Sequence, residues 1–204
     1  MQAVYVDLDG TLIEYAEPFP RIYADALCSL GVEPRELEAY SEAFFDLLGE
    51  ADDPFSAAIA KTDVPVDPDA FSDAMVDREV EAVRAVPGAD DLLETLAGDH
   101  QLGVLTNGVG SLQRAKLEAV GLADRVETVV VSGEVGVEKP DPEIYRIAEE
   151  RLPAGSYAFV ADDVERDLRP AVERDWHGVY VGEDDPGGEG VAVARSLAAV
   201  PDLL

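Results

Sequence analysis

The sequence contains a single cysteine among its 204 residues, so no disulfide can form within the chain. That residue, Cys28, lies in the helical pattern YADALCSLG, which favours a small buried side chain over a reactive thiol. No run of about 18 apolar residues occurs, which excludes a membrane-spanning helix. The N-terminus also lacks the basic region, apolar stretch and cleavage site of a signal peptide. These absences favour a cytoplasmic protein without a membrane partner.

Basic residues are scarce as well. The chain has 15 lysines and arginines against 44 acidic residues, a formal net charge of −29, and its only lysines are Lys61, Lys116 and Lys139. Such a chain repels itself at low salt, whereas about 1 M salt shortens the Debye length to about 3 Å and screens the repulsion. Because the acids are spread along the whole chain, the composition resembles that of halophilic proteins rather than an acidic tail or partner surface. The charge excludes nucleic-acid binding through a basic face.

Short apolar, β-branched runs recur along the chain and predict strands buried on both faces, as in a parallel sheet. These runs cover residues 4–6, 102–105, 128–131, 158–160 and 179–181. Helical patterns separate most of them, over 88–99, 111–121, 141–152 and 164–175. Pro170 falls inside the last pattern, so that helix must either begin near the proline or break there. The alternation predicts an α/β fold with a doubly wound parallel sheet.

The interval between Leu12 and about Ala85 breaks this rhythm, because it shows helical patterns and no good strand. The expected helices cover roughly 20–30, 34–50, 55–61 and 69–84, with prolines between them. An insert directly after the first strand would lie over the carboxyl ends of the strands, where open α/β sheets bind ligands. We therefore expect a core domain of residues 1–13 and 86–204 and a mobile helical cap of residues 14–85.

Two aspartates end the first strand, in the segment Asp7-Leu8-Asp9-Gly10-Thr11. A carboxylate is costly inside an apolar strand, so we expect both beyond its end, on the same side by strand alternation. Two carboxylates this close indicate either a divalent cation site or a nucleophile beside an acid or base. Gly10 and Thr11 allow the chain to leave the strand sharply.

Three further strand ends carry polar residues. Thr106 and Asn107 end the second strand directly before a helix, where a hydroxyl and backbone N–H groups can hold a phosphate. Lys139 follows the third strand, and its compact ammonium can neutralise a carboxylate and a phosphoryl oxygen together. Asp162 and Asp163 follow the fourth strand and indicate a hard cation bound by oxygens. Each segment alone is also explained as a turn or loop, but their order after successive strands predicts one shared site.

These four segments, in this order, resemble the motifs of the haloacid dehalogenase superfamily of hydrolases. DLDGTL is similar to the first motif, LTNG to the second, GVEKPDPEIY to the third and VADDVERD to the fourth. The insert after the first strand is similar to the family's helical cap of the first type. The resemblance covers nearly the whole chain and implies a Rossmann-like core, an inserted cap and Mg²⁺ as the cofactor.

The resemblance implies a role for each matching aspartate. Asp7 would attack a phosphoryl group, and Asp9 would protonate the leaving oxygen and then activate water. Mg²⁺ would be held by the Asp7 carboxylate, the Asp9 backbone carbonyl and Asp162, a set of oxygen ligands that suits this ion. The family's dehalogenases lack the second aspartate, so Asp9 favours phosphate chemistry.

The resemblance also implies phosphate-binding and supporting roles for other residues. Thr106 and the Asn107 backbone would hold phosphoryl oxygens, and Lys139 would offset the charge of Asp7 and of the phosphate. Asp167 would support either the metal's water shell or Lys139. Asp163 adds a carboxylate that can share the metal, and this possibility stays open.

We expect a Mg²⁺-dependent phosphatase that hydrolyses a small phosphorylated metabolite through an aspartyl-phosphate intermediate. A phosphomutase of the same superfamily, a receiver-like signalling protein and a non-catalytic phosphate-binding protein are the alternatives. The sequence leaves open the identity of the substrate and the oligomeric state.

Overall fold

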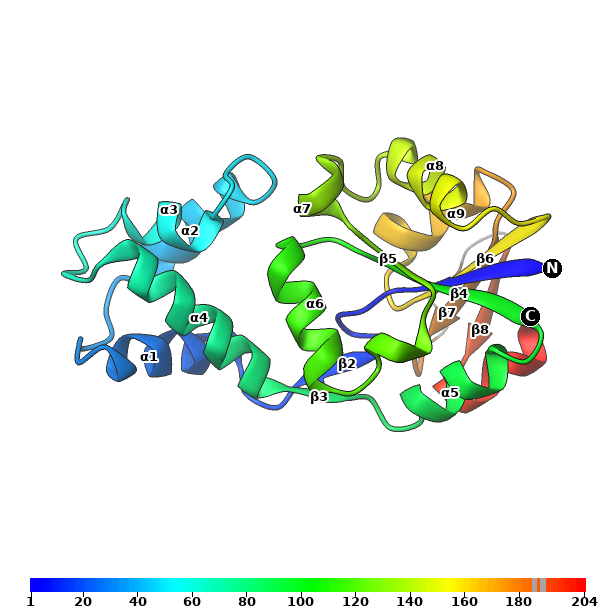
Figure 1. Cartoon of the computed structure of the whole chain (residues 1–204), viewed down its shortest axis with the longest axis horizontal. Helices are drawn as coiled ribbons and strands as arrows, with labels where there is room; N and C mark the ends of the chain where they lie inside the picture. The colour runs from blue at the N-terminus through cyan, green and yellow to red at the C-terminus, as the bar shows by residue number, and fades with distance from the viewer. Residues whose placement is uncertain (185–186, 188–189) are drawn as a thin grey trace.

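The computed structural model describes residues 1–184, 187 and 190–204 of the chain. Within them, six parallel strands form one sheet in the order β5-β4-β1-β6-β7-β8 (Figure 1). Their bounds are Gln2–Val6 for β1, His100–Thr106 for β4, Thr128–Val131 for β5, Ser156–Ala161 for β6, His177–Val181 for β7 and Val191–Ala194 for β8. The chain runs from β1 outward to β5 and returns on the other side with β6. The topological switch point, where such sheets bind ligands, therefore lies between β1 and β6.

Alternate residues of the central strand β1 face two different apolar cores, one on each side of the sheet. Val4 and Val6 pack in a core with helix α5 (Ala89–Leu96), whereas Ala3 and Tyr5 pack in a core with helix α8 (Pro142–Arg151). Helix α6 (Gly110–Ala119) joins α5 on the first face through Leu117. Helices on both faces confirm the predicted doubly wound, Rossmann-like α/β core.

The helical insert forms a separate lobe with an aromatic core of its own, beside the sheet (Figure 1). The ring centroids of Tyr23 and Tyr40 lie 4.8 Å apart, and those of Tyr40 and Phe71 lie 5.3 Å apart. Leu112 of α6 packs into the same core, so α6 is the part of the sheet domain that carries the lobe. The helical cap expected from the sequence is therefore present, while the boundaries of 14–85 remain a prediction. Its helices are α1 (Phe19–Ser29), α2 (Leu37–Leu47), α3 (Pro54–Ile59) and α4 (Pro68–Ala82).

The expectation that the interval between Leu12 and about Ala85 contains no strand is wrong, because two short strands connect the cap to the core. Strands β2 (Ile13–Tyr15) and β3 (Val83–Ala85) pair antiparallel, with Ile13 opposite Ala85 and Tyr15 opposite Val83. Each strand has three residues, which is too short to produce a periodic pattern in the sequence. The chain thus enters and leaves the cap through one two-stranded connection.

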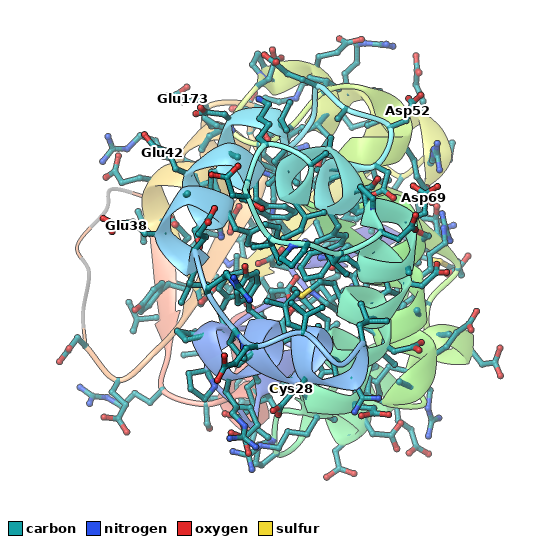
Figure 2. The ribbon with its side chains drawn as sticks, turned by 90° about the vertical axis from the view of Figure 1, so that its left-hand side faces the viewer. Cys28, Glu38, Glu42, Asp52, Asp69 and Glu173 are labelled. Carbon is teal, nitrogen blue, oxygen red and sulfur yellow. The ribbon has the colours of Figure 1, made fainter. Side chains whose placement is uncertain are left out.

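A helix begins near Pro170, as the sequence allowed, whereas the expectation that Cys28 is buried is wrong. The pattern over 164–175 is a π-helix, η2 (Val164–Leu168), followed by α9 (Arg169–Val172), and Pro170 lies in the first turn of α9, where a proline is tolerated. Cys28 is exposed rather than buried, because the buried face of α1 comprises Ile22, Tyr23, Ala26 and Leu27 (Figure 2). Cys28 therefore has no packing role.

Acidic side chains extend into solvent from both lobes, as Figure 2 shows for Glu38, Glu42, Asp52, Asp69 and Glu173, all of which are exposed. The high negative charge is thus carried on the surface, where salt can screen it. None of the helices in the described part of the chain has the length and apolar character that crossing a bilayer requires.

Candidate active site

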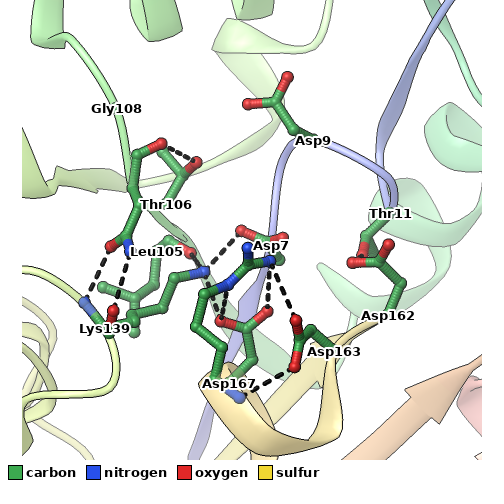
Figure 3. Close-up of polar contacts among 12 residues, drawn as sticks. Asp7, Asp9, Thr11, Leu105, Thr106, Gly108, Lys139, Asp162, Asp163 and Asp167 are labelled. Atoms are coloured by element: carbon green, nitrogen blue, oxygen red, sulfur yellow. Dashed lines mark hydrogen bonds and ion pairs between the residues drawn. The ribbon is translucent and has the colours of Figure 1, made fainter. Parts of the chain in front are cut away.

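Asp7 lies directly after β1, at the switch point between β1 and β6. Its backbone N–H donates to the Val160 carbonyl of β6 at 2.9 Å, and the residue is 2 % exposed. Lys139 Nζ donates to Asp7 Oδ1 at 2.7 Å and lies 2.9 Å from Asp167 Oδ1 (Figure 3). The same ammonium donates to the Leu105 carbonyl near the end of β4 at 3.1 Å. A buried lysine therefore joins the first, third and fourth polar segments into one site.

Burial dominates the electrostatics of Asp7. Loss of water raises the pKa of Asp7 to about 6, because the attraction of Lys139 only partly offsets burial, and the nearby Asp167 charge raises the pKa further. The carboxylate is ionised at neutral pH but poorly stabilised. A carboxylate in this condition is suited to act as a nucleophile or as a ligand to a cation.

Carboxylates around Asp7 could hold a divalent cation. Oxygen atoms of Asp7, Asp162 and Asp167 come within 4.8 Å of one another. Asp167 is already paired with Lys139 and with Arg166, whose Nε lies 3.3 Å away, whereas Asp162 accepts a long 3.4 Å hydrogen bond from the Thr11 hydroxyl. Asp7 and Asp162 thus retain the greater capacity to bind a metal. The oxygen-only donor set fits Mg²⁺.

The position of Gly10 requires a glycine, because the loop that follows β1 passes close to Asp162 there. A Cβ atom built on Gly10 would lie 2.2 Å from Asp162 Oδ2, and the backbone has a φ of +90° that favours glycine. The absence of a side chain brings the backbone that follows Asp9 close to the fourth segment. This approach suits the predicted use of the Asp9 carbonyl as a metal ligand.

Asp163 is not among the three carboxylates whose oxygen atoms lie within 4.8 Å of one another. It begins the π-helix by accepting the Arg166 backbone N–H at 2.9 Å, and the Arg166 guanidinium lies 3.9 Å from it (Figure 3). Proximity to Asp167, Asp7 and Asp163 raises the pKa of Arg166, which therefore stays charged. The structure gives Asp163 a capping contact, and Asp167 the contact with Lys139 that the sequence predicted as one of its two roles.

The second segment positions the loop that carries Lys139. The Lys139 backbone N–H donates to Asn107 Oδ1 at 2.9 Å, and Asn107 Nδ2 donates to the Lys139 carbonyl at 3.0 Å. The Asn107 side chain therefore has a structural contact that sequence reasoning missed, in addition to the backbone role predicted for it. Thr106 ends β4 with a buried hydroxyl that donates to the Asn107 carbonyl at 3.2 Å.

Asp9 points away from Asp7 in Figure 3, contrary to the expectation from strand alternation, because β1 ends at Val6 and its alternation ends with it. Gln113 Nε2 donates to Asp9 Oδ2 at 2.5 Å and to the Thr106 hydroxyl at 2.9 Å. Lys116 Nζ donates to Asp9 Oδ1 at 3.2 Å. Two buried side chains of α6 thus hold both oxygens of the Asp9 carboxylate.

Sequence reasoning missed the site contacts of Gln113, Lys116 and Arg166. Gln113 and Lys116 lie within α6, where no strand end marks them, whereas Arg166 lies in the fourth segment but was given no contact. Lys116 did carry a signal, because it is one of three lysines in the chain, the same scarcity that singled out Lys139. Its place at the third residue after Gln113 also puts both on one face of α6.

A cavity of about 420 Å³ lies beside the Asp9 contacts, between the connection and the cap. It is lined by Tyr15, Ala16, Glu17, Pro18, Phe19, Ile22 and Glu79. Lys116 joins this cavity to the site, because its ammonium lies 3.3 Å from Glu79 Oε2 and 4.9 Å from the centre of the Tyr15 ring. Mixed polar and apolar lining is typical of a site for a small molecule.

Comparison with known proteins identifies relatives of this chain. A family model described as haloacid dehalogenase-like hydrolase matches residues 1–173. The chain is 32 % identical over 164 residues to a phosphoserine phosphatase of Thermus thermophilus, covering 78 % of this chain and 53 % of that protein. It is 35 % identical over 108 residues to the pyrimidine 5′-nucleotidase YjjG of Escherichia coli, covering 50 % and 47 %.

The chain therefore spans about half the length of these curated relatives. Among solved structures, a HAD phosphatase from Thermococcus onnurineus superposes with a TM-score of 0.74 at 23 % identity, covering 99 % of this chain and 97 % of that one. This likeness shows that the two chains share a fold.

Proposed function

Because the chain belongs to the haloacid dehalogenase-like hydrolase family, we propose that it is a Mg²⁺-dependent phosphatase acting on a small phosphorylated metabolite through an aspartyl-phosphate intermediate. One observation carries the proposal. The buried Asp7 carboxylate lies 2.7 Å from the Lys139 ammonium at the end of the central strand, with a second aspartate two residues further on. A fixed carboxylate beside a fixed cation is suited to receive a phosphoryl group, because this transfer depends mainly on positioning and charge neutralisation.

In the first step, an Asp7 carboxylate oxygen forms a bond to phosphorus and the bond between phosphorus and the leaving oxygen breaks. Asp9 donates a proton to that leaving oxygen, so the product alcohol departs neutral. Lys139 offsets negative charge on Asp7 and the phosphoryl oxygens, which the Thr106 hydroxyl and the Asn107 backbone hold. When bound by Asp7, Asp162 and the Asp9 carbonyl, Mg²⁺ would add positive charge beside the phosphoryl oxygens.

In the second step, water attacks the phosphorus of the aspartyl-phosphate and Asp9 accepts its proton. The bond between phosphorus and the Asp7 oxygen breaks, which releases inorganic phosphate and restores the Asp7 carboxylate. Asp9 is protonated again and is ready for the next substrate. The two aspartates thus divide the reaction between a nucleophile and an acid–base group.

The cavity beside Asp9 favours a substrate with an uncharged, hydroxylated leaving group. Among the described residues that line it are two acids, Glu17 and Glu79, and no base. A second phosphate or carboxylate on the substrate would meet like charge there. Tyr15 and Glu79 offer hydrogen-bonding groups, whereas Phe19 and Ile22 offer apolar contact.

The test is phosphate release from a panel of phosphorylated metabolites in molar KCl with Mg²⁺. We expect activity in the wild type that requires Mg²⁺ and falls by at least about 100-fold in Asp7→Asn and in Asp9→Asn. Asp52→Asn, an exposed aspartate on the cap, is the matched control and retains full activity. Full activity in Asp7→Asn would overturn the choice of nucleophile. Conversion of the substrate to an isomer without phosphate release would favour a phosphomutase.

A further inference from the structure

Lys116 is a buried lysine that the proposed reaction does not use. Lys116 is 4 % exposed, and its ammonium lies 3.2 Å from Asp9 Oδ1 and 3.3 Å from Glu79 Oε2. Glu79 is itself buried and belongs to the cap helix α4, whereas Asp9 belongs to the core. The Tyr15 hydroxyl of the connection donates to the same Glu79 oxygen. One ammonium therefore joins the acid–base aspartate to the cap.

The direction of Asp9 agrees with the position of a leaving group. In phosphoryl transfer the attacking and leaving oxygens lie roughly in line on opposite sides of phosphorus. An acid that protonates the leaving oxygen must therefore reach the side of phosphorus opposite the nucleophile, and Asp9 points away from Asp7 in Figure 3. Lys116 and Gln113 hold the carboxylate in this direction.

The two contacts of Lys116 are both longer than the 2.7 Å bond between Lys139 and Asp7. Charge-assisted hydrogen bonds of full strength measure about 2.7–2.9 Å, so Lys116 is shared between two acids rather than bound tightly to one. Glu79 keeps the buried ammonium paired while Asp9 engages a substrate. Without Glu79, the buried Lys116 ammonium would be unpaired whenever Asp9 contacted the substrate instead, and an unpaired buried charge is costly.

We propose that Lys116 is a positioning residue that holds Asp9 toward the leaving group and ties this orientation to the cap through Glu79. The inference rests on the proposed role of Asp9 as the acid of the first step. A misplaced acid slows the departure of a poor leaving group, which needs the proton, more than that of a good one. Loss of Lys116 is therefore expected to change the dependence of the rate on the leaving group.

The test compares kcat/KM, which reports the step in which the leaving group departs, for glycerol phosphate and p-nitrophenyl phosphate. In Lys116→Met we expect a fall of at least about tenfold with glycerol phosphate and of less than about threefold with p-nitrophenyl phosphate. The double variant Lys116→Met/Glu79→Gln removes both charges, leaves no unpaired buried acid on the cap, and is expected to show the same selective loss. Lys61→Met, an exposed lysine of the cap, is the control and changes neither rate.

Equal losses with the two esters in Lys116→Met and in the double variant, or no loss in either, would overturn the positioning role. Asp9→Asn in the same assay separates the two proposals. If Asp9→Asn shows the selective loss and the Lys116 variants do not, the inference about Lys116 fails and the phosphatase proposal stands. If the wild type releases phosphate neither from these esters nor from any member of the metabolite panel, the phosphatase proposal itself fails and the inference fails with it.

Discussion

Replacement of the proposed nucleophile is expected to stabilise the fold. Asp7→Asn keeps the shape of the side chain and removes a buried negative charge whose pKa burial raises from 3.8 to about 6. That rise corresponds to a penalty of about 3 kcal/mol on the ionised carboxylate in the folded state at neutral pH. Lys139 loses one partner but keeps Asp167 at 2.9 Å and the Leu105 carbonyl at 3.1 Å. We therefore expect Asp7→Asn to increase the free energy of unfolding by about 1–3 kcal/mol while abolishing activity.

The gain should depend on pH with a definite sign. Because the pKa of Asp7 is higher in the folded chain than the ordinary 3.8, the folded wild type binds a proton that the unfolded chain releases. The resulting stabilisation of the wild type is fully present below pH 3.8 and is lost as the pH rises through about 6. The difference between variant and wild type is therefore small at about pH 3.8 and below, grows as the pH rises from about 4 to about 6, and reaches its full value above about pH 7.

Urea unfolding of both proteins in molar KCl with a metal chelator measures this difference. The buried Trp176 is the only tryptophan of the chain and reports the transition by fluorescence. A lower free energy of unfolding for Asp7→Asn at neutral pH would refute the reasoning, because the pairing with Lys139 would then outweigh burial. A gain that stays the same from about pH 4 to about pH 8 would also refute it, because ionisation of Asp7 would not be its source.

Three further predictions concern the metal, the first loop and salt. Mg²⁺ at 100 times its Kd should raise the free energy of unfolding of the wild type by about 2.7 kcal/mol. The same Mg²⁺ concentration should raise the free energy of unfolding of Asp162→Asn by less, and equal increases in the two proteins would show that Asp162 does not bind the metal. Gly10→Ala should cost about 1–3 kcal/mol more than Gly49→Ala, since both glycines have a positive φ but only the new Cβ at Gly10 meets Asp162; equal costs in urea unfolding would contradict the contact. Raising KCl from about 0.1 M to about 1 M should raise the thermal midpoint as the Debye length falls from about 10 Å to about 3 Å; a falling midpoint would show that self-repulsion does not limit stability.

The fold followed from the sequence where buried strands produce continuous apolar runs. The five predicted runs all lie in the sheet, because strands buried on both faces need apolar residues at every position. Strand β8 was missed, since it has four residues, two of them alanine, and lies at the edge of the sheet. The pair β2 and β3 was missed because its stability comes from pairing across 70 residues rather than from local pattern.

The candidate site could be predicted from the sequence in part, because parallel strands place their carboxyl ends at the same end of the sheet. Asp7, Lys139 and Asp162 are predicted from strand ends and Asp167 from the resemblance, and the structure brings these four residues together. The contacts of Asp9 were not predictable in this way. Lys116 reaches Asp9 and Glu79 from inside a helix, and the packing of three separate elements decides that meeting.

The two-stranded connection also bears on how such a chain could change its specificity. Residues 13–15 and 83–85 lie side by side, and the Ala16 N–H donates to the Ala82 carbonyl at 2.8 Å directly beyond them. The core is therefore covalently joined to the insert at a single pair of adjacent attachment points, whatever length of chain lies between them. Domain insertions are tolerated where the two ends of the inserted chain are close. The helical lobe can thus be exchanged without breaking the strands of the core, and its replacement would change the walls of the cavity in which we propose the substrate binds.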